Sequence, residues 1–164
     1  MALLNLLFIM KRPLAFYLLC LVHFLLGANA LFGGGALIIS PDGSLLGMPP
    51  GWLDGSPFDN FLLPGLTLFL FNGVFPLFIL AGLIFKPRWS WANALNLYAD
   101  RHWAWTYSLY SGIIVIIWIT VQLLYVPPFI LQPIFIAVGL VILVLTLTPG
   151  VMRYYLIQVA DNAT

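Results

Sequence analysis

The positions of the six basic residues limit what this chain can fold into. All six fall on one side of four long apolar runs: before the first, between the second and third, and after the fourth, at Lys11, Arg12, Lys86, Arg88, Arg101 and Arg153. The other connections, roughly 40–60 and 126–132, contain no Lys or Arg. Cytoplasmic loops of membrane proteins are enriched in these residues. The distribution predicts an all-α membrane protein, a four-transmembrane-helix bundle with the N- and C-termini cytoplasmic.

The composition excludes several classes of protein. Apolar residues make up 63% of the 164 residues and charged residues 7%, whereas about 25% are charged in ordinary soluble domains. A soluble domain of this size cannot bury so much apolar surface. The net charge of +1 gives no basic surface for nucleic acid. A single cysteine, Cys20, excludes an intrachain disulfide. We therefore expect one membrane domain, 1–164, with the lipid bilayer as its surroundings.

The lengths of the apolar runs place the four spans at about 14–39, 57–85, 103–126 and 130–149. An outer loop at 40–56 and an inner interfacial segment at 86–102 remain between them. The inner segment is rich in tryptophan, which favours the headgroup region of a bilayer. Residues 1–10 are predicted to form a short helix along the inner surface.

Two details of these spans have alternatives. Ser56 is a good N-cap and Pro57 suits a first helical position, so the second helix is predicted to start there, with Pro64 and Pro76 inside it. The first run could instead be a signal peptide cleaved after the Ala-Asn-Ala sequence that ends at Ala30. The apolar run continues beyond that point, which favours a membrane span.

Small and polar residues recur every three or four positions within the spans, so they share one face of each helix. Because lipid gives no hydrophobic drive between helices, such faces are expected to pack together. Helix packing is predicted at Gly27, Ala30, Gly34 and Gly139. Seam or ligand contacts are predicted at His23, Asn29, Asn72, Ser111, Gln122 and Gln132.

Depth in the membrane can be compared through the helical rise of about 1.5 Å per residue. By this measure His23 and Ser111 lie level, and we predict that the first and third spans meet there. Asn29 and Asn72 both lie near the midplane, so a carrier of small apolar molecules would have its cavity around them. The two glutamines lie level near the outer surface.

Few residues of the chain have side chains suited to catalysis or to binding a metal or cofactor. His23 is the only titratable side chain well inside the spans, and it is expected to be a neutral packing residue rather than a proton relay, a ligand contact or a haem ligand. The only other histidine, His102, belongs to the interfacial polar cluster Asp100-Arg101-His102. The aspartates of the outer loop match no calcium-binding pattern. We therefore predict no metal and no cofactor.

Short loops, a turn-rich first outer loop and Arg101-His102-Trp103 at the start of the third span resemble the small, uncharacterised four-helix proteins of bacterial inner membranes. This resemblance implies no particular activity. The first prediction is a non-enzymatic polytopic protein that acts through a membrane protein partner or through self-association as a homo-oligomer. The second is a binder or carrier of a small apolar or lipid-like molecule in the seam of the bundle. The third is a membrane enzyme that uses His23 or the Asp100–His102 cluster.

Overall fold

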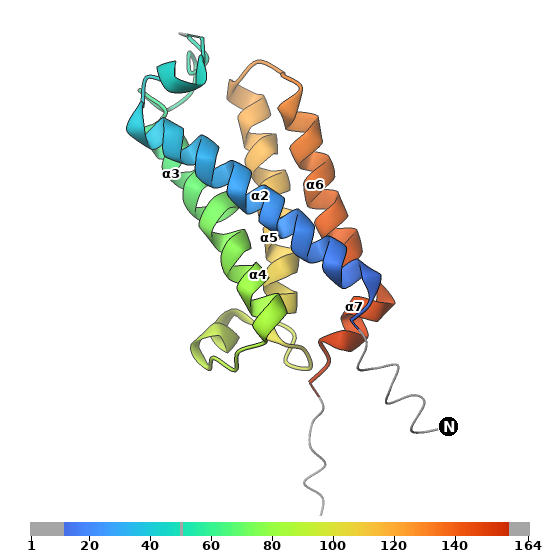
Figure 1. The fold of residues 1–164 in the computed structure, drawn as a ribbon. Coiled ribbons are helices and arrows are strands. Elements are labelled where there is room, and N and C mark those ends of the chain that lie inside the picture. Colours follow the sequence, from blue (N-terminus) through green and yellow to red (C-terminus); the bar gives the residue numbers. More distant parts are fainter. Residues whose placement is uncertain (1–11, 50, 158–164) are drawn as a thin grey trace, which may run out of the picture.

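The structure is a computed structural model that describes residues 12–49 and 51–157. The described residues form an all-α bundle (Figure 1) of α2 (Leu14–Ile39), α5 (Trp103–Tyr125), α6 (Leu131–Thr146) and one long helix built from α3 (Leu62–Thr67), η2 (Leu68–Val74) and α4 (Phe75–Phe85). Three short helices, η1 (Ser44–Leu46), η3 (Trp91–Leu95) and α7 (Pro149–Tyr154), lie between or after these elements. The helix predicted at residues 1–10 lies outside the described residues.

Three helices of the described residues are long and apolar enough to cross a membrane: Leu14–Ile39, Leu62–Phe85 and Trp103–Tyr125. The fourth apolar helix, α6, is shorter, with 16 residues. Such a set of helices is that of a multi-pass membrane protein. The outer surfaces of these helices carry many exposed Leu, Ile, Val and Phe side chains, as lipid contact requires.

The first helix, α2, packs against two neighbours, the long α3–η2–α4 helix and α6, and α5 packs against α4 and α6. In Figure 1, α2 crosses the bundle obliquely in front of α5. The closest approach is at Gly34, where an added Cβ would lie 2.7 Å from the amide nitrogen of Phe69 and 2.8 Å from the carbonyl oxygen of Gly65. Small residues therefore bring the backbones of α2 and the long helix into contact.

Glycines join α5 and α6 in the same way. A Cβ at Gly139 would lie 2.9 Å from the carbonyl oxygen of Gly112, and a Cβ at Gly112 would lie 3.0 Å from the carbonyl oxygen of Gly139. The bundle thus consists of two glycine-packed pairs, α2 with the long helix and α5 with α6. The pairs contact each other between α2 and α6, and between α4 and α5, where Gly82 packs against the ring of Trp103.

The long helix begins at Leu62, so the prediction that it starts at 57 with Ser56 as its cap is wrong. Ser56 instead accepts a hydrogen bond from the amide of Phe58. The reason for the later start is Pro64, which has no N–H to donate and whose ring conflicts with a helical carbonyl four residues earlier. In the first turn neither property matters. The amide of Leu62 is bonded by the side chain of Asn60.

Pro76 has a different effect, because it lies in the middle of the long helix. It cannot donate to the carbonyl of Asn72, four residues earlier. The preceding segment, η2, is a π-helix, and the Phe75 amide bonds the Leu70 carbonyl, five residues back. The wider turn accommodates the proline without breaking the helix. It also places Asn72 and Gly73 on the buried side.

The two ends of the bundle differ in charge. One end, here called the basic end, carries the start of α2, the end of α4, segment 86–102 and α7, with Arg12, Lys86, Arg88, Arg101 and Arg153. Arg12 contacts the Tyr154 hydroxyl, Lys86 donates to the Tyr154 carbonyl and Arg101 donates to the Met152 carbonyl. The opposite end, here called the lid end, carries segment 40–61 and the turn between α5 and α6.

Candidate functional site

A cavity of about 700 Å³ lies between the helices at the lid end. Its walls come from α2, the long helix, α5 and α6. Most of the lining is apolar, and much of it is aromatic: Phe32, Trp52, Phe58, Phe61, Trp118, Tyr125, Phe129 and Phe135. In the part of the chain that the structure describes, the lining contains no Lys, Arg, Asp, Glu or His. Both the size and the lining are typical of sites for small, uncharged ligands.

The segment between α2 and α3 forms a lid over this cavity. Leu46, Met48 and Trp52 of the lid line the cavity. The ring of Trp52 lies 5.3 Å from the ring of Phe129 in the turn between α5 and α6, measured between centroids. The lid therefore reaches from the first helix pair to the second.

Tight turns give the lid its shape. Gly43 has a φ of 78°, a left-handed conformation, and a Cβ there would lie 3.0 Å from the ring of Phe61. Next to it, Asp42 accepts hydrogen bonds from the hydroxyl of Ser40 and from the amide and hydroxyl of Ser44. These hydrogen bonds lower the pKa of the Asp42 carboxyl, with the Ser40 bond contributing most. Turns and hydrogen bonds among the residues of the lid thus fix its conformation.

Three residues of the cavity lining have buried polar atoms without a partner among the described residues. Both the amide nitrogen and the oxygen of Asn72 are buried and unbonded, as are Nε1 of Trp118 and Nε2 of Gln132. Asn72 and Gln132 are each 1% exposed. A buried polar atom without a hydrogen bond is rare, because its desolvation is not offset.

The structure therefore places four of the six predicted contact residues at one cavity: Asn29, Asn72, Gln122 and Gln132. Their roles differ. Asn29 is exposed and donates to the Leu25 carbonyl of its own helix, whereas Gln132 accepts a bond from the Phe129 amide through Oε1. Sequence reasoning did not predict Trp118 as a contact residue. A tryptophan on a polar helical face was the available indication, since buried indole N–H groups need acceptors.

The other two predicted residues, His23 and Ser111, lie outside this cavity lining. His23 is completely buried, with Nε2 3.4 Å from the hydroxyl of Ser108 and Nδ1 3.0 Å from the Leu19 carbonyl. Ser108 lies one turn before the predicted Ser111 on α5 and also contacts the Thr146 hydroxyl at 2.8 Å. A carbonyl can only accept, so Nδ1 carries a proton and donates to it. His23 is thus held by contacts within the bundle, and its neutral state stays a prediction.

The oblique path of α2 explains why His23 contacts Ser108 instead of the predicted Ser111. The depth comparison assumed parallel helices, whereas α2 crosses α5 at an angle (Figure 1). Ser111 is buried, and its hydroxyl has no partner among the described residues.

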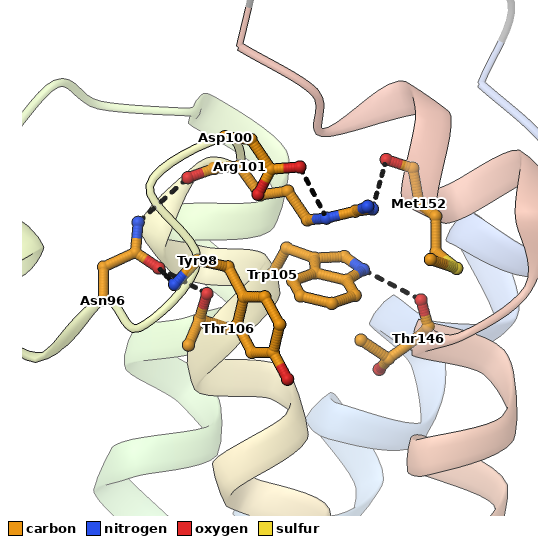
Figure 2. Close-up of polar contacts among 8 residues, drawn as sticks. All are labelled: Asn96, Tyr98, Asp100, Arg101, Trp105, Thr106, Thr146 and Met152. Carbon is orange, nitrogen blue, oxygen red and sulfur yellow. Dashed lines mark hydrogen bonds and ion pairs between the residues drawn. The ribbon is translucent and has the colours of Figure 1, made fainter.

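The polar cluster predicted at Asp100–His102 links several elements of the basic end. Figure 2 shows the contacts of Asp100 and Arg101. The guanidinium of Arg101 lies 4.6 Å over the Trp105 ring, donates to the Met152 carbonyl at 3.1 Å and pairs with Asp100 at 3.5 Å. Trp105 in turn donates to the Thr146 carbonyl at 2.9 Å. Asn96 bonds the Arg101 carbonyl and the hydroxyl of Thr106. These contacts tie segment 86–102 to α5, α6 and α7.

His102 caps α5. Its Nδ1 accepts the amide of Ala104 at 3.2 Å, and its Nε2 lies 3.0 Å from the Pro87 carbonyl, to which it donates. Burial lowers the pKa of His102. Both ring nitrogens are engaged by the backbone, so the geometry gives this histidine a capping role.

Lys86 ends α4 with a left-handed backbone, φ 48°, and its ammonium lies 3.3 Å from the Tyr154 ring centroid. Burial, and then the nearby charge of Arg12, lowers the pKa of Lys86 to about 8. The ring attracts the charged form and opposes this effect. Lys86 thus fastens α4 to α7.

Among the described residues, no three His, Cys, Asp or Glu side chains gather as metal ligands do. The prediction that the protein holds no metal and no cofactor stays a prediction. No protein-family model, no curated protein and no solved structure matches the chain. What the protein does is therefore inferred from its own residues.

Proposed function

We propose that the protein is a non-enzymatic polytopic membrane protein that binds a small, neutral, lipid-like molecule in the cavity at the lid end. The observation that carries the proposal is a cavity of about 700 Å³ between the helices, with a mostly apolar lining that contains no charged side chain among the described residues. An empty cavity of this kind would leave its apolar walls without contacts. A mostly apolar ligand would supply these contacts.

The proposal includes four membrane crossings, with segment 86–102 and both termini in the cytoplasm and the lid outside. Two observations support it: the one-sided distribution of Lys and Arg in the sequence, and the gathering of Arg12, Lys86 and Arg101 at one end of the bundle. Stacked Trp89, Trp91 and Trp103 at the same end suit a headgroup layer.

This topology predicts the result of cysteine labelling. In a background with Cys20 replaced by Ala, Ser44→Cys should react with a membrane-impermeant maleimide added to intact cells. Ser90→Cys should react only after the cells are opened. Labelling of both positions from outside, or the reverse result, would contradict the four-span arrangement.

The ligand proposal predicts that purified protein carries a lipid. Native mass spectrometry of protein extracted in mild detergent should show about one neutral lipid per chain. Gly33 lines the cavity, and a Cβ there meets nothing closer than 3.6 Å, so Gly33→Phe places a ring in the ligand space. This variant should lose most of the bound lipid.

Gly35→Phe is the matched control, because Gly35 is absent from the cavity lining and its Cβ has comparable room, with the nearest atom 3.9 Å away. It should keep the lipid. Equal lipid content in the two variants, or no specific lipid in the original protein, would contradict the proposal.

Partner binding and self-association stay predictions of the sequence. The exposed apolar side chains suit a protein partner and bilayer lipid equally well. For the enzyme alternative, both nitrogens of His102 are held by the backbone, and His23 is bonded within the bundle. These arrangements support the non-enzymatic proposal.

A further inference from the structure

Part of the cavity lining reaches the outer surface of the bundle. Two lining residues on α2 are exposed, Asn29 and Phe32, and Phe32 is 75% exposed. Leu131 of α6 also lines the cavity and is 48% exposed. The other exposed helical residues of the lining, Val121 and Tyr125 of α5, are 39% and 37% exposed. The most exposed part of the rim therefore lies on α2 and α6.

The path of α2 accounts for an opening between these two helices. Just before its first turn, Pro13 lies beside α7, where a Cβ added at Gly150 would be 3.2 Å from the Cβ of Pro13. Further along, from Gly27 to Gly34, α2 follows the long helix, and a Cβ at Gly27 would lie 3.1 Å from the carbonyl oxygen of Gly73. Figure 1 shows the same course, from α6 and α7 at one end to α3 at the other. The helix α2 thus leaves α6 on its way to the lid end.

In the proposed four-span arrangement this opening lies within the hydrocarbon layer. The helix α2 has 26 residues, so its centre lies between residues 26 and 27. By the helical rise, Asn29 is roughly 4 Å and Phe32 roughly 8 Å from that centre, whereas the hydrocarbon layer extends about 15 Å to each side. Acyl chains rather than water therefore surround the opening. The lid covers the cavity at the end of the bundle, where Trp52 contacts Phe129.

We propose that the ligand is a neutral lipid dissolved in the bilayer, and that it enters the cavity sideways between α2 and α6 rather than through the lid. This inference rests on the proposed function and specifies the source of its ligand. A hydrocarbon chain that moves from the bilayer into the cavity exchanges one apolar environment for another, so entry does not expose the chain to water. Entry through the lid would separate Trp52 from Phe129 and bring the chain through the aqueous surface.

The test follows uptake of diacylglycerol by the delipidated full-length protein in phosphatidylcholine vesicles. Samples are extracted in mild detergent at successive times, and native mass spectrometry counts the diacylglycerol bound per chain. To hold the lid closed, Trp52→Cys and Phe129→Cys are combined with Cys20→Ala and joined by a short bismaleimide, since the two rings lie 5.3 Å apart between centroids. The same variant capped with N-ethylmaleimide is the control. Cross-linked and capped protein should take up diacylglycerol at the same rate.

A second pair of variants tests the opening itself. Asn29→Trp places an indole ring at the rim on α2 and should slow uptake at least about fivefold, because an entering chain must displace the ring. Leu25→Trp, one turn earlier on the same helix, is the matched control. Leu25 is 49% exposed and absent from the cavity lining, so this variant should keep the original rate. Both positions are exposed, so both variants should fold.

The outcomes separate the route of entry from the lipid site. Loss of uptake in the cross-linked protein would show that the lid must open, and would overturn sideways entry. Equal rates in Asn29→Trp and Leu25→Trp, whether slowed or unchanged, would overturn it too, because the opening between α2 and α6 would not control entry. No bound diacylglycerol in the original protein overturns the inference as a whole, and no lipid in the protein as purified overturns the proposed function as well.

Discussion

Replacing Gly34 by alanine is expected to destabilise the protein more than any other single methyl group added to its helices. The new Cβ would lie 2.7 Å from the amide nitrogen of Phe69, 2.8 Å from the carbonyl oxygen of Gly65 and 2.9 Å from the Cα of Phe69. All three are backbone atoms, which cannot move aside as a side chain can. The two helices must separate, with a loss of about 1–3 kcal/mol or more in the free energy of unfolding.

Gly35→Ala is the control, because the two glycines are adjacent in the same helix. A Cβ at Gly35 meets only the ring of Phe69, at 3.9 Å. Alanine favours a helix over glycine by up to about 1 kcal/mol, so this variant should be as stable as the original protein or slightly more stable. Titration with sodium dodecyl sulfate, followed by circular dichroism, measures both. Equal midpoints for the two variants would show that the contact at Gly34 is looser than described.

Replacing Asn72 by leucine should have the opposite effect on stability. In the ligand-free protein both polar atoms of Asn72 are buried without partners among the described residues. A leucine of similar size removes this desolvation penalty, which is about 1–3 kcal/mol for an unsatisfied polar group. The variant should therefore melt at a higher temperature after lipid removal.

Asn29→Leu tests whether any asparagine-to-leucine change would do the same. Asn29 is exposed, and its amide already donates to the Leu25 carbonyl, so its replacement should shift the free energy of unfolding by less than about 0.5 kcal/mol. Thermal melts of delipidated protein give the comparison. A lower melting temperature for Asn72→Leu would mean that the Asn72 amide is satisfied in the free protein.

The sequence predicted helix positions well where apolar length alone decides them. The first helix matches the predicted 14–39, and the third ends one residue before the predicted 126. The start of the second helix was wrong because Ser56-Pro57 has the features of a helix start, whereas Pro64 is accommodated best in the first turn of the helix that forms. The π-helical turn before Pro76 was also beyond periodicity, which cannot show how a bundle accommodates a proline.

The site was predicted in part for a similar reason. Polar residues on helical faces are rare in apolar spans, so Asn72 and Gln132 were recognisable from sequence. Which of them remains without a partner depends on neighbours from other helices, and that is a property of the assembled bundle. The lid over the cavity depends on where Trp52 meets Phe129, 77 residues later in the chain.

The glycine contacts also have a mechanical consequence. Each helix pair is locked internally, by Gly34 against Phe69 in one and by Gly112 against Gly139 in the other. The pairs contact each other at the basic end through Gly82 and Trp103, in the centre through His23 and Ser108, and at the lid end through Trp52 and Phe129. Loss of the Trp52–Phe129 contact would remove the link at the lid end and leave the glycine contacts inside each pair intact.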